Sequence, residues 1–293
     1  MIVFNRQSVR QHRNRAATNL RDHDFLFRET AARLVDRLND VTRTFRVALD
    51  LGCHGGEVAA ALDDIGGPET LVQCDLSAKM AYLARRERSS VAVCADEELL
   101  PFGEQTFDLV LSNLSLHWVN DLPGALAQAR RSLKPDGLFL GALLGGDTLH
   151  ELRHALNTAE IEVEGGLSPR LSPFADVRDV GNLLSRAGFS LPVADRETIT
   201  VSYPDALKLM SDLRGMGETN ANVLRRGEFS RRTTLLRAAE IYHQAFGDEN
   251  GRIPATFEIL FLTAWAPHDS QPKPLRPGSA QGRLAEALGV PEP

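Results

Sequence analysis

The sequence predicts an α/β fold around a mostly parallel β-sheet, because short apolar strands alternate with helix-length segments in the first half of the chain. Five strands are expected at residues 46–50, 71–74, 91–95, 107–112 and 137–144. The last two are almost wholly apolar, which is typical of strands buried on both faces. Connections of helix length between them favour parallel pairing with right-handed crossovers.

Helices are expected between these strands, and the rhythm changes after residue 145. Helical patterns cover residues 57–64, 77–88, 122–133, 147–164, 177–187, 204–214 and 230–246. Two further strands, at residues 197–203 and 256–265, bring the expected total to seven. Gly66-Gly67-Pro68 and the turn at residues 134–137 are the clearest breaks.

The pattern divides the chain into three parts. Residues 1–44 are expected to form an N-terminal helical lid, and residues 45–265 the main domain, with helical insertions at about 147–175 and 204–250. Residues 266–293 are rich in Pro, Gly and polar residues, which predicts a flexible tail with at most a short helix near 284–288.

The N-terminal segment is basic. Residues 1–21 are Arg-rich and acid-poor, as in a transit peptide, but they run into a helical pattern, which favours an ordered helix pair. Four arginines of this segment have three possible roles, as a lid over a ligand, as a docking patch for a partner, or as a solvated helix face. The sequence does not decide among these roles for Arg6, Arg10, Arg13 and Arg15.

Composition excludes several classes of protein. With 43% hydrophobic and 25% charged residues, the chain is expected to be globular rather than disordered. The sequence contains no run of 18 or more apolar residues, so no membrane-spanning helix is expected. The net charge of −6 argues against a nucleic-acid partner. Three cysteines are too few for a disulfide scaffold, so a reducing compartment fits best.

A Gly-rich turn between the first strand and the first helix of the sheet carries the strongest chemical signal. Gly52 and Gly56 lie where backbone N–H groups can approach a ligand at a helix N-terminus. Asp50 ends the strand before the turn, and Asp75 and Asp96 end the next two. Because such strand ends converge on one crevice, these acids suit a ribose and a cation better than a pyrophosphate. S-adenosylmethionine (SAM) carries an ammonium, a sulfonium and a ribose, and no phosphate.

The chain resembles the class I SAM-dependent methyltransferases in segments 50–56, 75–80, 95–97 and 107–113. The resemblance implies a Rossmann-like fold, with a mostly parallel seven-stranded sheet, helices on both faces and a helical insertion before the last strand. It implies SAM as cofactor, held by Asp50, Gly52, Cys53, Gly56, Asp75, Leu76, Met80, Asp96, Glu97, Asn113 and Leu114.

Within that resemblance, each position has its own expected role. The loop 50–56 is expected at the methionine part of SAM, Asp75 at the ribose and Asp96 beside the adenine amine. Asn113 and Leu114 are expected near the methionine end. His54 departs from the family pattern, which usually has Gly there.

A narrower resemblance spans nearly the whole chain, through segments 145–153, 164–169, 172–174, 214–220 and 253–258. In these the chain is similar to the mitochondrial and alphaproteobacterial complex I assembly factors with arginine hydroxylase activity. This implies a protein substrate, the quinone-site subunit of complex I that neighbours the terminal iron–sulfur cluster. It further implies a cytoplasmic location in a bacterium, or the matrix side of the inner membrane in a mitochondrion. No integral membrane segment is expected, and peripheral membrane contact stays open.

Three functions remain open at this point. The chain modifies a complex I subunit with SAM as ligand, or it is a SAM-dependent O-methyltransferase of a small molecule or acyl-carrier protein, or it is a non-catalytic assembly chaperone. The near-full-length resemblance favours the first, and the second corresponds to a more distant resemblance, to the biotin-pathway methyltransferase that caps malonyl-acyl-carrier protein. Methyl transfer mainly needs alignment and exclusion of water, so it requires no obvious base. The His-x-Asp/Glu motif that is typical of an iron-binding facial triad occurs at none of the eight histidines. Hydroxylase activity is therefore implied by the resemblance alone.

Four residues are candidates for catalysis: His117, Trp118, Asp147 and Tyr203. Arg153, Arg170 and Glu218 are further polar candidates for the substrate pocket. The segment 150–154 spells H-E-x-x-H, but no third ligand follows at a known zinc spacing, so an amphipathic helix is expected instead of a metal site.

Overall fold

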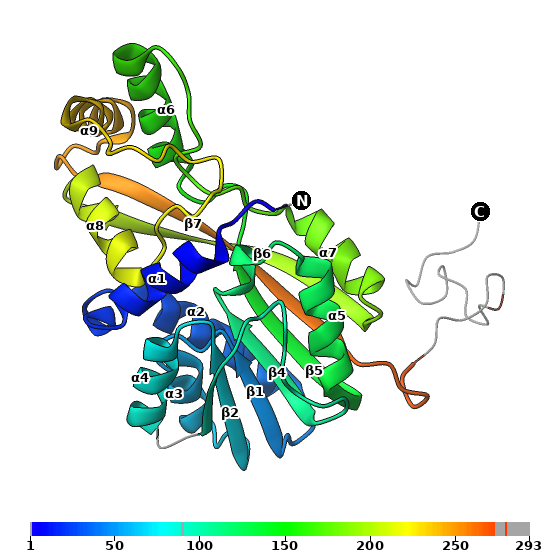
Figure 1. The fold of residues 1–293 in the computed structure, drawn as a ribbon. Helices are drawn as coiled ribbons and strands as arrows, with labels where there is room; N and C mark the ends of the chain where they lie inside the picture. The colour runs from blue at the N-terminus through cyan, green and yellow to red at the C-terminus, as the bar shows by residue number, and fades with distance from the viewer. Residues whose placement is uncertain (1, 89–90, 273–278, 280–293) are drawn as a thin grey trace.

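The computed structural model describes residues 2–88, 91–272 and 279, and its centre is one seven-stranded sheet (Figure 1). The strands are β1 (Val47–Leu51), β2 (Thr70–Asp75), β3 (Val91–Cys94), β4 (Phe107–Asn113), β5 (Leu133–Leu144), β6 (Ser190–Tyr203) and β7 (Ile253–Trp265). Their order is β3-β2-β1-β4-β5-β7-β6, and β7 runs antiparallel to both of its neighbours. The predicted mostly parallel, seven-stranded α/β fold is confirmed.

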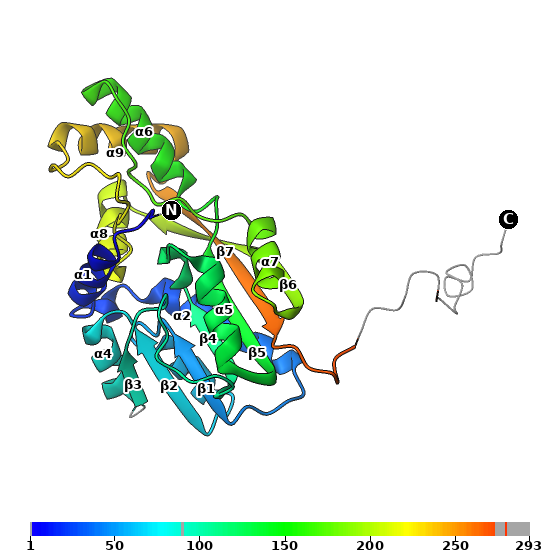
Figure 2. The same ribbon diagram turned by 45° about the vertical axis from the view of Figure 1, so that its right-hand side comes forward.

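Helices cover both faces of this sheet (Figures 1 and 2). They are α1 (Arg6–Ala16), α2 (Phe25–Asp36), α3 (Glu57–Asp63), α4 (Ala78–Arg88), α5 (Leu122–Ser132), α6 (His150–Glu164), α7 (Val177–Arg186), α8 (Ala206–Met216) and α9 (Arg232–Phe246), with short 3-10 helices η1 (Leu20–Asp22), η2 (Arg37–Asp40) and η3 (Leu116–Trp118). Strand alternation explains the two layers. Ala48 of β1 packs in the core beneath α2 and α3, whereas its neighbour Leu49 packs in the core beneath α5 and α7.

Three predicted boundaries differ from the structure. β5 begins at Leu133 instead of residue 137, because Leu133 pairs with Phe107 before a register shift, and the expected turn becomes an irregularity within the strand. β6 begins at Ser190 rather than 197, since its first half pairs with β7 without the apolar alternation that would reveal it. α6 begins at His150 rather than 147, because Leu149 has a φ of 53° and is not helical.

The helices α6, α8 and α9 lie beyond the ends of β6 and β7, and α1 packs against α8 and α4 (Figure 1). This places the N-terminal helix between the first half of the sheet and the inserted helices. The division into a lid, a main domain and a tail stays a prediction, and the expected short helix at 284–288 lies outside the described residues. Among the described residues, no helix has the length and apolarity needed to span a bilayer.

Candidate cofactor and acceptor site

Four acidic side chains gather at the ends of three neighbouring strands, and we call Asp50, Asp75, Asp96 and Glu97 the acid cradle. β1 pairs with β2 and β2 with β3, all in parallel, so these strands end at one edge of the sheet. Asp50, Asp75 and Glu97 are fully buried. The predicted gathering of these acids at one edge of the sheet is therefore present in the fold, and their contact with one ligand stays a prediction.

Asp50 is the cradle residue whose protonation burial changes most clearly. Burial raises the pKa of this carboxyl to about 8, and the nearby charge of Asp75 acts in the same sense, while Gln73 opposes it. Asp50 is therefore mostly protonated at neutral pH, and a positively charged ligand beside it would favour its ionised form.

The glycine turn fits tightly against the loop after β4. Gly52 has a φ of 79°, and a Cβ at this position would lie 2.0 Å from the Ser115 hydroxyl oxygen. The N–H groups of Gly52 and Cys53 both donate to the carbonyl of Cys74, at 2.7 and 2.9 Å. Gly56 has a φ of 91° and is the N-cap of α3. Glycine is therefore required at residue 52 by both conformation and space.

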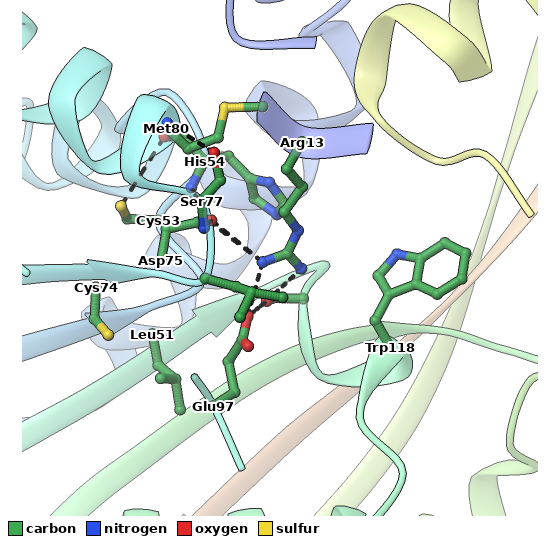
Figure 3. A network of polar contacts seen from close by, with 12 residues as sticks. Arg13, Leu51, Cys53, His54, Cys74, Asp75, Ser77, Met80, Glu97 and Trp118 are labelled. Carbon is green, nitrogen blue, oxygen red and sulfur yellow. Dashed lines mark hydrogen bonds and ion pairs between the residues drawn. The ribbon is translucent and has the colours of Figure 1, made fainter. Parts of the chain in front are cut away.

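An arginine from α1 reaches into the cradle (Figure 3). The side chain of Arg13 is 1% exposed, and its Nη1 lies 2.7 Å from Glu97 Oε1 and 3.4 Å from Asp75 Oδ2. Its Nη2 donates to the hydroxyl of Ser115 at 2.9 Å. Burial by itself would raise the pKa of Glu97, but Arg13 and Arg6 lower it to about 2. The charge of Glu97 is therefore compensated inside the protein.

Arg6, two turns before Arg13 on α1, pairs with Asp96 and Glu97. Arg10 and Arg15 on the same helix are exposed. Arg6 and Arg13 thus contact the cradle, and a role as a lid over a ligand stays a prediction. Arg10 is exposed to solvent, and Arg15 is exposed at the rim of the cavity described below.

His54 also lies inside the predicted cofactor site. Its Nε2 is 3.1 Å from the carbonyl oxygens of both Asn113 and Leu114, and its ring stacks on Phe27 with centroids 4.1 Å apart. Burial and Arg13 lower the pKa of the imidazole, so the ring is neutral and Nε2 is the donor to these carbonyls. The family departure at His54 therefore places a side chain on the two carbonyls expected at the methionine end.

The other predicted cofactor residues are buried around the cradle. Cys53 and Met80 are 2% and 0% exposed, and Leu76 packs against Phe4 and Trp118. Asn113 donates from its side chain to the carbonyl of Phe27 at 2.9 Å. These positions frame the site with apolar surface.

A cavity of about 340 Å³, which we call the acceptor cavity, adjoins the cradle. Phe27, Leu114 and Trp118 line it on the side of the cradle. The rest of its wall comes from segments far apart in the chain, including α6, α8, residues 170–174 and residues 218–220. This cavity is therefore where a second reactant could lie next to a ligand in the cradle.

The four catalytic candidates separate into two pairs. His117 and Trp118 are buried and both contact Glu218: the indole N–H lies 3.0 and 3.1 Å from its two carboxylate oxygens, and His117 Nε2 lies 3.1 Å from one of them. Trp118 and Glu218 line the acceptor cavity. Asp147 is exposed and Tyr203 is buried in the core at the end of β6, and neither is among the residues that line this cavity.

The H-E-x-x-H segment serves packing. Glu151 is buried and accepts from the Thr256 N–H at 3.3 Å, while His150 and His154 meet the Phe246 ring edge-on. In the part of the chain that the structure describes, no group of three or more His, Cys, Asp or Glu side chains is arranged so that it could hold a metal ion, and Cys53, Cys74 and Cys94 are free thiols.

Sequence reasoning missed the partners of the cradle and of the cavity. Nothing in the sequence marks Ser115 or Phe27, and the basic character of α1 did not reveal which arginine is buried. The contact between Glu218 and Trp118 joins residues 100 positions apart, so no local pattern could reveal it.

Comparisons with known proteins agree with this geometry. A family model described as a methyltransferase domain matches residues 49–141. The chain is 47% identical to the mitochondrial arginine-hydroxylase NDUFAF5 of Danio rerio, over 98% of this chain and 89% of that protein. It is 34% identical to the malonyl-[acyl-carrier protein] O-methyltransferase of Methylovorus sp. (strain MP688), over 90% of each.

Similarity among solved structures supports the fold. Haemonchus contortus phosphoethanolamine N-methyltransferase 2, solved in complex with S-adenosyl-L-methionine, is similar with a TM-score of 0.55 at 15% identity, over 89% of this chain and 60% of that chain. Together with the near-complete overlap with the arginine hydroxylases, these findings identify the family. The chain belongs to the family of the arginine-hydroxylase NDUFAF5, within the class I methyltransferase superfamily.

Proposed function

We propose that this chain binds SAM in the acid cradle and modifies an arginine of a protein partner, a subunit of respiratory complex I. The observation that carries the proposal is the 47% identity to an arginine hydroxylase over 98% of the chain, against 34% to the O-methyltransferase. The modification we propose is hydroxylation, and the site of action is the cytoplasm of a bacterium or the mitochondrial matrix.

The chemical types of the cradle residues match the groups of SAM. Asp75 would accept from the ribose hydroxyls, and Asp50 would lie near the cationic methionine part. Asp50 is fully buried, with Gln73 as a hydrogen-bonding neighbour and no ion pair to an arginine or lysine among the described residues, which suits a ligand that brings a cation. To bind, SAM would displace two side chains of the chain itself. These are Arg13, which contacts Asp75, and His54, which contacts the carbonyls of residues 113 and 114.

The group that SAM can donate from its sulfonium is a methyl group, which contains no oxygen. Hydroxylation therefore takes its oxygen from a second reactant, such as O₂ together with a two-electron donor that reduces the other oxygen atom to water. What this chain contributes is the buried apolar surface of Phe27, Leu114 and Trp118 in the wall of the acceptor cavity, which keeps water from the reacting groups.

The test is mass spectrometry of complex I subunits purified from a wild-type strain and from a strain that lacks this gene. The proposal expects an arginine that carries one extra oxygen only when the gene is present. An unmodified subunit with stalled assembly would favour a chaperone instead.

The similarity to malonyl-[acyl-carrier protein] O-methyltransferases supports one second candidate, methyl transfer to an acyl-carrier substrate. In that case the deletion strain would need added biotin, and its complex I would be unchanged.

A further inference from the structure

The acceptor cavity has an unusual balance of charge. Of the described residues that line it, Glu218 is the one carboxylate, and His12, Arg15, Arg170 and Arg214 are basic. Arg170 is already paired, with its Nη2 2.8 Å from Glu160 Oε1. Burial and the neighbouring Arg15 lower the pKa of His12, so it is neutral at physiological pH. Arg15 and Arg214 are exposed at the rim, where solvent screens them. The charge inside the cavity is therefore negative and belongs to Glu218.

Glu218 is held in place by ring nitrogens of Trp118 and His117, not by a contacting arginine or lysine. Burial raises the pKa of Glu218, but His117 and the Trp118 hydrogen bonds lower it overall, so the carboxylate is ionised. Among the described residues, no arginine or lysine forms an ion pair with it. Arg13 acts on it only through the wider field, since the hydrogen bonds of Arg13 go to Asp75, Glu97 and Ser115.

The contacts of this buried carboxylate are two ring nitrogens, those of Trp118 and His117, and a second, permanently charged group beside it would compensate its burial further. Two carboxylate oxygens offer about four acceptor positions, and Trp118 and His117 do not use all of them. A guanidinium group matches the remaining positions, because its planar N–H groups bind a carboxylate in pairs. Leu114 and the indole of Trp118 offer apolar surface for the three methylenes of an arginine side chain.

We propose that Glu218 is the residue that receives the guanidinium of the substrate arginine, and that Trp118 and His117 position its carboxylate. The inference rests on the proposed function and adds the residue that selects arginine. Glu218 would favour arginine over citrulline, which has the same shape but no charge.

The two tryptophans of the chain allow a direct test by NMR. The indole N–H of Trp118 donates to Glu218, whereas Trp265 ends β7 and lies outside the acceptor cavity. Heteronuclear spectra of ¹⁵N-labelled protein, with the indole signals assigned by Trp265→Phe, are recorded during titration with N-acetyl-arginine methylamide and with the citrulline analogue.

The proposal expects a saturable shift of the Trp118 signal with the arginine compound, at an affinity about tenfold or more above that of citrulline. The Trp265 signal should stay in place. In Glu218→Gln the preference for arginine should vanish, while the amide oxygen can still accept from Trp118. Glu228→Gln, which removes an exposed carboxylate from the loop before α9, is the matched control and should keep the preference.

Equal responses to the two compounds, no response to arginine, or an unchanged preference in Glu218→Gln would each overturn the assignment of Glu218. A merely structural Glu218 would alter stability without touching this ratio. The readout is also independent of catalysis. An unmodified complex I subunit together with an intact arginine-dependent shift would count against the modification and leave the recognition standing.

Discussion

The acid cradle and the acceptor cavity both contain buried carboxylates, but the contacts that hold these carboxylates differ. In the cradle, Asp75, Asp96 and Glu97 are paired with Arg6 and Arg13, which come from α1, and the deeply buried Asp50 is mostly protonated. In the cavity, Glu218 is held by ring nitrogens and has no contacting arginine or lysine among the described residues. The difference indicates that the cradle is stable before its ligand binds, and that it must open an ion pair to accept one. In the cavity, the Glu218 carboxylate remains available to pair with the cationic group of the proposed substrate.

The strongest way to break this comparison is to remove the internal cation of the cradle. Arg13→Ala leaves Glu97 and Asp75 buried without it, so the free energy of unfolding should fall by about 3–5 kcal/mol. Arg10→Ala, on the exposed side of the same helix, should change it by less than about 0.5 kcal/mol. Urea unfolding measures both. Equal effects of the two substitutions would mean that the Arg13 cluster is not a real feature of the folded protein.

The tight turn of the cradle gives the next largest effect. In Gly52→Ala, the positive φ and the overlap with Ser115 act together, and we expect destabilisation of about 2–4 kcal/mol. Gly66 has a φ of 74° with open space around it, so Gly66→Ala isolates the conformational penalty, about 1 kcal/mol. Thermal unfolding of the two variants should differ clearly. A Gly52→Ala protein as stable as Gly66→Ala would show that residues 52 and 115 do not meet.

Asp50 gives the cradle a dependence on pH. Its pKa is about 8 in the folded chain, above that of an unfolded aspartate, so the folded protein holds the extra proton and loses stability as the pH rises from about 4 to 8. Asp50→Asn removes this loss. Its stability relative to wild type should therefore increase with pH over that window, by at most about 1.4 kcal/mol per unit.

Burial also raises the pKa of Glu57 to about 8, and the charge of Asp50 contributes to that shift, so the comparison is made in a Glu57→Gln background to isolate Asp50. Denaturant unfolding at several pH values gives the measurement. A constant difference between the proteins with and without Asp50→Asn in this background would show that Asp50 is ionised throughout.

The same contrast explains how much could be read from the sequence. The cradle is built from strand ends and one turn, so residues close together in the sequence, such as Asp50, Gly52 and Gly56, reveal the turn, and the order of strands and helices predicts where the strand ends meet. Strand periodicity failed where β6 begins, because residues 190–196 pair with β7 without an apolar alternation.

The cavity is different, since Phe27, Trp118 and Glu218 meet only after the chain has folded. Arg13 was one of several arginines with the same sequence context, and only packing distinguishes it from Arg10. His54 was visible as a departure from the family, but its ring on the carbonyls of Asn113 and Leu114 was not.

The central claim, that SAM binds in the acid cradle, is tested most directly by calorimetric titration of SAM into wild type and Asp75→Asn. Asparagine preserves the size of the side chain and removes the charged acceptor of the ribose. The affinity should fall by about 1–3 kcal/mol. The same affinity in both proteins would contradict the claim.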